Sequence, residues 1–266
     1  MIVAVGERIK AVGPRWKVKI PKGALTIEAK NKFVIPGLID CHCHMEMVGL
    51  GDLADLPPEW DTPERRRQLT LVNAKLDLLS GVTTVRDLGS TEVLFRVRDE
   101  INSGAQVGPR ILAAGRQLVK KSPGAYLDKT FVEYDGPEDA RAKVRQQVVL
   151  GAEWIKIRIS RRPGRPLPTA EEMRAIVDEA HRLGCRVAVH TDVPDDEAVA
   201  FAANADVDSI EHNAALRVKD EKILSEMARK GIALMPGPSL YIQRIENQGA
   251  DHTLDPMTKR LMPQEV

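Results

Sequence analysis

Seven short runs rich in β-branched residues recur along this chain, and stretches with helical periodicity separate them. This alternation is typical of repeated strand–helix units, whose strands lie side by side in a parallel sheet. The sequence therefore predicts an α/β fold and restricts the topologies open to the chain. The expected strands span residues 33–44, 81–89, 109–115, 153–160, 185–191, 207–213 and 231–237.

Helix start signals lie between the expected strands. Thr62 precedes a proline and an apolar periodic stretch, which predicts that a helix begins there. Thr169 and Glu172 have the spacing of a capping box, and Asp220 can cap a further helix. The remaining expectations are a short helix within 194–205 and two long loops, 45–60 and 116–136.

The first 33 residues have a different rhythm from the rest. Apolar and polar residues alternate there, and glycines and prolines interrupt them, which predicts short strands and turns. We therefore expect two parts, a small β region over 1–33 and the α/β domain over 34–266.

Charge and composition exclude several classes of protein. The 39 lysines and arginines nearly balance the 38 aspartates and glutamates, whereas a nucleic-acid binder usually carries a strong basic excess. No apolar run reaches the roughly 18 residues of a membrane span, and the N-terminus lacks the pattern of a secretory signal. Three cysteines do not make a disulfide framework. We expect a cytoplasmic protein with a small-molecule substrate and neither a nucleic-acid nor a membrane partner; a homo-oligomer is left open.

The segment "IDCHCHM", residues 39–45, places two histidines beside two cysteines. In a strand, His42 and His44 share one face while Cys41 and Cys43 share the other, so all four cannot hold one ion. A zinc knuckle also needs a more widely spaced cysteine pair and a second pair elsewhere. We interpret the cysteines as small buried hydrophobic residues. The histidines alone are compatible with metal ligands or with ordinary hydrogen-bonded side chains.

Two more histidines end predicted strands. His190 ends "RVAVH" and His212 ends "VDSIEH", so four of the six histidines in the chain lie at predicted strand ends. The carboxyl ends of parallel strands meet at one rim, which favours a shared metal site. His181 lies within a predicted helix and His252 in a polar tail, where we expect surface or packing roles.

A lysine interrupts the fourth strand. In "EWIKIRIS", residues 153–160, Ile155, Ile157 and Ile159 share one face and suit a helix layer, which turns Lys156 toward the histidines. Burial lowers the pKa of such an amine, and nearby metal ions would repel its charged form. The neutral amine can add carbon dioxide and become an anionic carbamate ligand. Pairing with an interior carboxylate is the alternative role.

Seven motifs occur in the same order as in the amidohydrolase superfamily. The chain most closely resembles its imidazolonepropionase-like branch and the metal-dependent Xaa-Pro dipeptidases of the prolidase type. This resemblance implies a distorted (β/α)8 TIM barrel, with residues 1–33 as the remnant of a small β-sandwich domain. The motifs are VIPGLIDCHCHM, GVTTVRDLG, GPRILAAG, GAEWIKIRIS, RVAVHTD, VDSIEHN and GIALMPGPSLY.

The resemblance also implies a site with one or two Zn²⁺ ions. His42 and His44 would hold the buried ion, and His190 and His212 the more exposed one. Lys156 would bridge the two ions as a carbamate, in other words a carboxylysine. Water activated at the metals would cleave an amide-type C–N bond in a dipeptide or N-acyl amino acid. A cyclic-amide, lactone or phosphotriester hydrolase on the same site is the alternative, as is a catalytically weak barrel fragment.

The chain departs from the family pattern near its C-terminus. The family places an aspartate at the end of an eighth strand, where it ligates metal and transfers protons. Asp251 and Asp255 lie in a polar tail rather than after an apolar strand, so we assign neither this role. We expect a chain truncated at both ends, without an eighth strand and weakened in acid–base catalysis. Arg116, Arg158 and Tyr241 are candidates to bind a substrate carboxylate, with packing or surface roles as the alternative.

Overall fold

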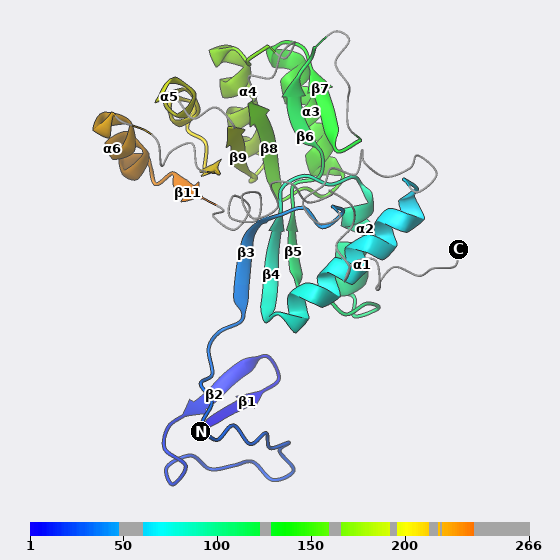
Figure 1. Cartoon of the computed structure of the whole chain (residues 1–266), viewed down its shortest axis with the longest axis vertical. Coiled ribbons are helices and arrows are strands. Elements are labelled where there is room, and N and C mark those ends of the chain that lie inside the picture. Colours follow the sequence, from blue (N-terminus) through cyan, green and yellow to red (C-terminus); the bar gives the residue numbers. More distant parts are fainter. Residues whose placement is uncertain are drawn as a thin grey trace, which may run out of the picture. The chain divides into compact units, whose positions relative to one another are not determined.

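The computed structural model divides the chain into two compact units, Met1–Pro36 and Gly37–Val266 (Figure 1). In the first unit, β1 (Ile2–Val5) and β2 (Arg8–Val12) form an antiparallel hairpin, which agrees with the short strands and turns expected there. That this unit is part of a small β-sandwich domain stays a prediction. The structure describes residues 1–47, 61–122, 129–159, 166–191, 196–212, 218 and 220–236.

The second unit is built from two sheets in which every pair of neighbouring strands is parallel. Each of the seven predicted strands contains an observed strand, so the α/β prediction is confirmed. The three-stranded sheet has the order β3 (Leu38–Cys43), β4 (Val82–Asp87), β5 (Arg110–Ala113). The six-stranded sheet has the order β11 (Ala233–Met235), β10 (Ser209–Glu211), β9 (Arg186–Thr191), β8 (Trp154–Ile159), β6 (Gln117–Lys120), β7 (Phe131–Tyr134).

The prediction of a long loop over 116–136 is wrong, because β6 and β7 both lie in it. Each has only four residues, and they stand in a stretch rich in glycine, proline and charge, so their composition resembles that of a loop. Most of the other expected loop, residues 48–60, lies outside the described residues.

A bend at Gly115 lets one continuous run of chain serve both sheets. Strand β5 pairs with β4, and after the bend β6 pairs with β8. Gly115 has φ of 70°, and a Cβ atom there would lie 2.7 Å from the Phe95 ring and 2.6 Å from the Gln147 amide. Only glycine meets both the backbone and the packing requirement at this position.

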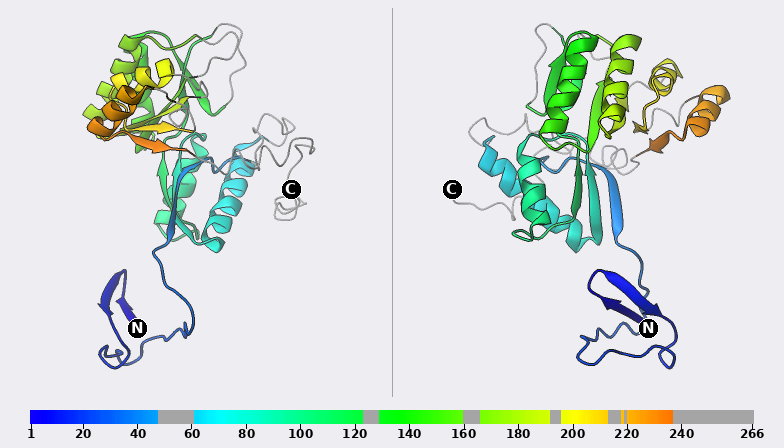
Figure 2. Two further views of the ribbon diagram at one scale, coloured as in Figure 1. Left: turned by 60° about the vertical axis from the view of Figure 1, so that its left-hand side comes forward. Right: turned by 180° about the vertical axis from the view of Figure 1, so that it is seen from behind.

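Helices connect the strands and cover the sheets (Figure 2). The helix starts predicted at Thr62, Thr169 and Asp220 are confirmed, since each side chain accepts a backbone hydrogen bond from the first turn. Within the described residues, none of the helices has the length and apolarity needed to cross a bilayer. The helices are α1 (Pro63–Leu79), α2 (Val93–Asn102), α3 (Pro137–Val149), α4 (Ala170–Arg182), α5 (Asp196–Asn204) and α6 (Glu221–Lys230).

The hydrophobic core includes residues of both sheets and of the helices that cover them. Ile155, Ile157 and Ile159 of β8 are at most 2% exposed and belong to the same apolar cluster as Ile176 of α4. The opposite face of β8 carries Lys156, which is also fully buried. Strand alternation therefore separates an apolar face from a face with reactive groups, as the sequence predicts.

The end of β10 departs from this alternation. Glu211 and His212 are adjacent, yet both side chains contact His42: the Glu211 carboxylate is 2.6 Å from His42 Nδ1, and the two imidazole centroids are 4.7 Å apart. His212 has φ of 70°, in the left-handed region, and this conformation turns its side chain to the same side as Glu211. Such a conformation costs a non-glycine residue about 1–2 kcal/mol.

We predict that replacing Thr169 with alanine lowers the free energy of unfolding by about 1 kcal/mol. Thr169 and Glu172 exchange two hydrogen bonds in a capping box, whereas Thr62 contributes one side-chain bond of 3.3 Å to α1. Urea denaturation should therefore show a smaller loss for Thr62→Ala. Equal losses, or a larger loss at Thr62, would contradict the assignment of the box.

We also predict that His212→Gly is more stable than His212→Ala by about 1 kcal/mol, because glycine adopts the left-handed conformation without cost. Both substitutions remove the same imidazole. The difference between their free energies of unfolding, measured by urea denaturation, therefore reports the cost of the left-handed backbone conformation. His190 on β9 provides the control, since glycine in a regular strand is less stable than alanine. The same order of stability at both positions would show that His212 is not strained.

Candidate metal centre

The imidazoles that the sequence singles out converge at the carboxyl ends of β3, β9 and β10. The centroid of His42 lies 5.4 Å from that of His44 and 4.7 Å from that of His212, and His212 lies 4.4 Å from His190. Lys156 of β8 approaches the same group, with Nζ 3.4 Å from His42 Nε2. The structure therefore brings all five residues together; that they bind metal stays a prediction.

The cysteines behave differently from the histidines. Cys43 packs against the apolar core, where burial raises the pKa of its thiol. Cys185 is buried, and its Sγ donates to the Ala152 carbonyl oxygen at 3.3 Å. Neither pattern is that of a metal ligand, and all three cysteines have free thiols. The interpretation as small hydrophobic residues agrees with the packing of Cys43 and Cys185, whereas for Cys41, which is half-buried, it stays a prediction.

Burial sets the protonation of the cluster. It lowers the pKa of His42 well below its usual value and that of His212 to about 3, and the charge of Lys156 is the second cause in both. Burial likewise lowers the pKa of Lys156 to about 7, although the Glu211 carboxylate opposes this shift. His42 and His212 are therefore neutral near pH 7, which is the form that binds metal ions.

Two charged residues that the sequence reasoning did not assign support His42. The Glu211 carboxylate is fully buried, with Oε2 2.6 Å from His42 Nδ1. Arg86 Nη2 donates to Glu211 Oε1 at 2.9 Å, and Ser209 Oγ donates to the same oxygen at 2.6 Å. The signal in the sequence was weak, because the predicted strands that hold Arg86 and Glu211 contain other polar and charged residues as well.

His44 is oriented by the loop after β4. Its Nδ1 lies 2.9 Å from the Gly89 carbonyl oxygen. The loop is held in turn by Asp87, a fully buried carboxylate that accepts from the backbone nitrogens of Met45 at 2.6 Å and Gly89 at 3.0 Å. In both His42 and His44, Nδ1 thus lies at a hydrogen-bond acceptor, which leaves Nε2 for another partner.

The candidate substrate-binding residues have different surroundings. The Arg158 guanidinium lies 5.6 Å from the centroid of the Phe131 ring, and its charge is among those that lower the pKa of Lys156. Arg116 forms an ion pair with Glu92 at 2.8 Å. Tyr241, Asp251 and Asp255 lie outside the described residues. A role for any of them in substrate binding or catalysis stays a prediction.

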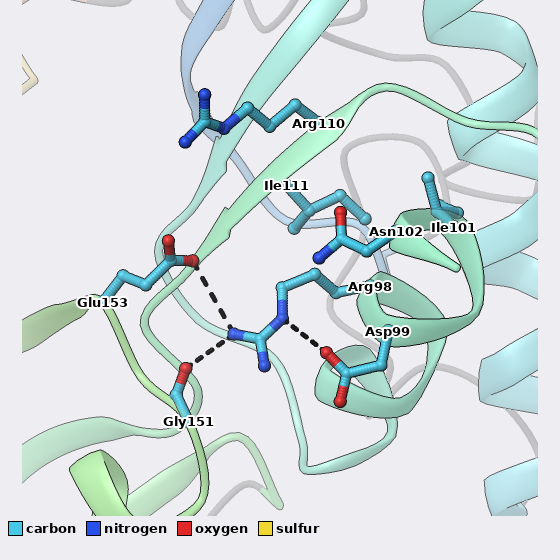
Figure 3. A pocket seen from close by; sticks show the side chains of 8 residues that line it. All are labelled: Arg98, Asp99, Ile101, Asn102, Arg110, Ile111, Gly151 and Glu153. Atoms are coloured by element: carbon cyan, nitrogen blue, oxygen red, sulfur yellow. Dashed lines mark hydrogen bonds and ion pairs between the residues drawn. The ribbon is translucent and has the colours of Figure 1, made fainter. Parts of the chain in front are cut away.

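A cavity of about 730 Å³ lies at the opposite, amino ends of β5 and β8 (Figure 3). Arg98 crosses it and donates to the Gly151 carbonyl oxygen at 2.6 Å, with Glu153 3.6 Å away. Because these residues lie at the amino ends of the strands, the cavity is separate from the histidine cluster at the carboxyl ends. The cavity is lined by Arg98, Asp99, Ile101, Asn102, Arg110, Ile111, Gly151 and Glu153.

The chemistry of the donor set fits divalent zinc. Four half-buried imidazoles and a fully buried lysine whose pKa is lowered to about 7 supply nitrogen donors. As they stand, no three histidine, cysteine, aspartate or glutamate side chains of the described residues form a group that could hold one ion. One reason is that His212 Nε2 and His190 Nδ1 are bonded to each other at 2.7 Å. Binding would have to replace this bond.

Comparison with known proteins places the chain in a family. The model of the amidohydrolase family matches residues 33–260. An uncharacterized protein of Mycobacterium tuberculosis is 31% identical over 209 residues, 77% of this chain and 50% of that protein. Ochratoxinase of Aspergillus niger is 27% identical over 233 residues, 75% of this chain and 46% of the enzyme. The chain thus spans about half the length of these curated relatives.

Solved structures agree with this assignment. A prolidase in complex with N-methylphosphonate-L-proline has a TM-score of 0.78 and 29% identity, over 97% of this chain and 65% of that one. A Xaa-Pro dipeptidase with bound methionine has a TM-score of 0.69 and 28% identity, over 91% of this chain and 65% of that one. With its parallel strands and connecting helices, the chain has a TIM-barrel-like hydrolase fold and belongs to the amidohydrolase family.

Proposed function

We propose that this chain is a zinc-dependent hydrolase that cleaves an amide-type C–N bond in a dipeptide or N-acyl amino acid. The observation that carries the proposal is a group of four neighbouring imidazoles, one of which, His42, lies 3.4 Å from the buried amine of Lys156. Membership of the amidohydrolase family and the likeness to a Xaa-Pro dipeptidase support the reaction class. A small-molecule substrate and a cytoplasmic location remain predictions from composition.

The proposed ligands divide into two pairs. His42 and His44 would hold the deeper ion, because acceptors already orient both rings through Nδ1. His190 and His212 would hold the second ion once their mutual hydrogen bond is replaced. When bound, zinc supplies Lewis acidity, which activates water and polarises the substrate carbonyl.

Lys156 would join the two pairs as a carbamate. Its uncharged amine can attack the carbon of carbon dioxide and release one proton, which converts a cation into an anion. Its complete burial beside His42 favours this change, because a protonated amine there lacks water and repels metal ions. Arg158 follows two residues later on the same face of β8, and we propose that it binds a substrate carboxylate.

The first test is hydrolysis by the full chain. Purified protein loaded with zinc is expected to cleave members of a panel of Xaa-Pro dipeptides and N-acyl amino acids, measured by amine release. Chelation should abolish cleavage and zinc should restore it, because the proposed reaction needs the ion.

His190→Ala should remove the activity, while His181→Ala serves as the matched control, since His181 pairs with Asp208 at 2.8 Å and is 41% exposed. Turnover that survives chelation would contradict the role of zinc. Bound zinc without turnover would instead favour the reading of a barrel that binds metal but does not catalyse hydrolysis.

The second test concerns Lys156. Metal analysis of wild-type protein should give two ions per chain with bicarbonate and fewer without it, because carbon dioxide supplies the bridging atoms. Lys156→Ala should lose this dependence. Lys120→Ala is the matched control, because Lys120 also lies in a strand of the six-stranded sheet but pairs with Glu172. One ion per chain, indifferent to bicarbonate, would contradict the carbamate.

A further inference from the structure

The Glu211 carboxylate has no exposed surface, and Arg86 and Ser209 both donate hydrogen bonds to it. Arg86 Nη2 lies 2.9 Å from Oε1 and 3.2 Å from Oε2, and Ser209 Oγ donates to Oε1 at 2.6 Å. These contacts fix the plane of the carboxylate. They leave Oε2 directed at the nearest nitrogen of His42, Nδ1, at 2.6 Å.

A carboxylate can only accept hydrogen bonds, so a bond of this length requires a proton on His42 Nδ1. In a neutral imidazole the other nitrogen then carries a lone pair. That nitrogen, Nε2, lies 3.4 Å from Lys156 Nζ, and the centroid of the His42 ring lies 4.7 Å from that of His212.

We propose that Glu211 is a positioning residue that holds His42 in the Nδ1–H tautomer and thereby presents Nε2 as a ligand to a divalent cation. The ligand role rests on the proposed function, but the tautomer does not. Arg86 is the second part of this device. Its Nε donates to the Cys41 carbonyl oxygen at 2.6 Å, so one guanidinium links the backbone of the strand that carries His42 to the carboxylate that orients it.

The substitution Glu211→Gln tests this with little change of shape. The glutamine carbonyl oxygen must take the place of Oε1, because Ser209 and Arg86 both donate there. The amide nitrogen then takes the place of Oε2 and donates to His42 Nδ1. His42 must move its proton to Nε2, which removes the lone pair that would bind an ion.

Nitrogen-15 NMR of the imidazoles in the metal-free protein reads the tautomer directly. We expect the Nδ1–H form of His42 in wild type and the Nε2–H form in Glu211→Gln. Zinc affinity of the variant, measured by competition with a chelator, should fall about 10- to 100-fold. Glu172→Gln is the control, because Glu172 is also a buried carboxylate, at 2% exposure, but serves the cap of α4; it should change neither readout.

An Nε2–H tautomer in wild type would overturn the proposal without any variant, and so would an unchanged tautomer in a folded Glu211→Gln. A purely structural role would lower stability in both glutamine variants and leave the tautomer as it was. If wild type shows the Nδ1–H form but binds no zinc, the proposed function fails while the positioning role of Glu211 stands.

Discussion

The ion pair between Arg86 and Glu211, buried inside the unit that carries the histidines, is the interaction on which the site depends. Removing two charges from water is costly, and their mutual attraction offsets this only when further hydrogen bonds satisfy both groups. Here the guanidinium also contacts the Cys41 carbonyl oxygen and lies 4.4 Å from the centroid of the Trp154 ring. The carboxylate is completed by Ser209 and His42.

This arrangement explains how basic nitrogens can share a small space without repulsion. If the imidazoles and Lys156 were protonated, several positive charges would lie within a few ångströms of one another. Burial instead favours the neutral forms of His42, His212 and Lys156, and the Glu211 carboxylate matches the charge of Arg86. The cluster thus presents the lone pairs of its imidazole and amine nitrogens in a largely buried setting, which suits a positively charged ligand.

The sequence predicts much of this structure because two signals are reliable, the alternation of side chains along strands and the capping residues of helices. Alternation along β8 places Lys156 inward and its isoleucines against the helices, and capping residues locate the starts of α1, α4 and α6. Alternation fails at His212, where two neighbouring side chains point the same way. His212 lies beside His42 and His190, as the sequence suggested, but its orientation comes from a backbone conformation that residue patterns do not reveal.

The supporting residues were missed for a related reason. Glu211 and Arg86 are separated by 125 positions in the chain, so their pairing follows from the tertiary fold and from no local motif. Strands β6 and β7 are too short and too polar in context to stand out from a loop. Sequence patterns identify the histidines at the ends of strands. Contacts between strands that are distant in the sequence, such as Arg86 with Glu211, decide how these histidines are oriented.

The bend at Gly115 has a consequence for cooperativity. Since β5 and β6 are one run of chain shared by two sheets, neither sheet can open over that run without pulling on the other. The two sheets therefore behave mechanically as one unit of unfolding, despite the break in hydrogen bonding between them. The histidines from β3 and β9 belong to different sheets. They keep their relative positions because the short β5–β6 segment joins these two sheets directly.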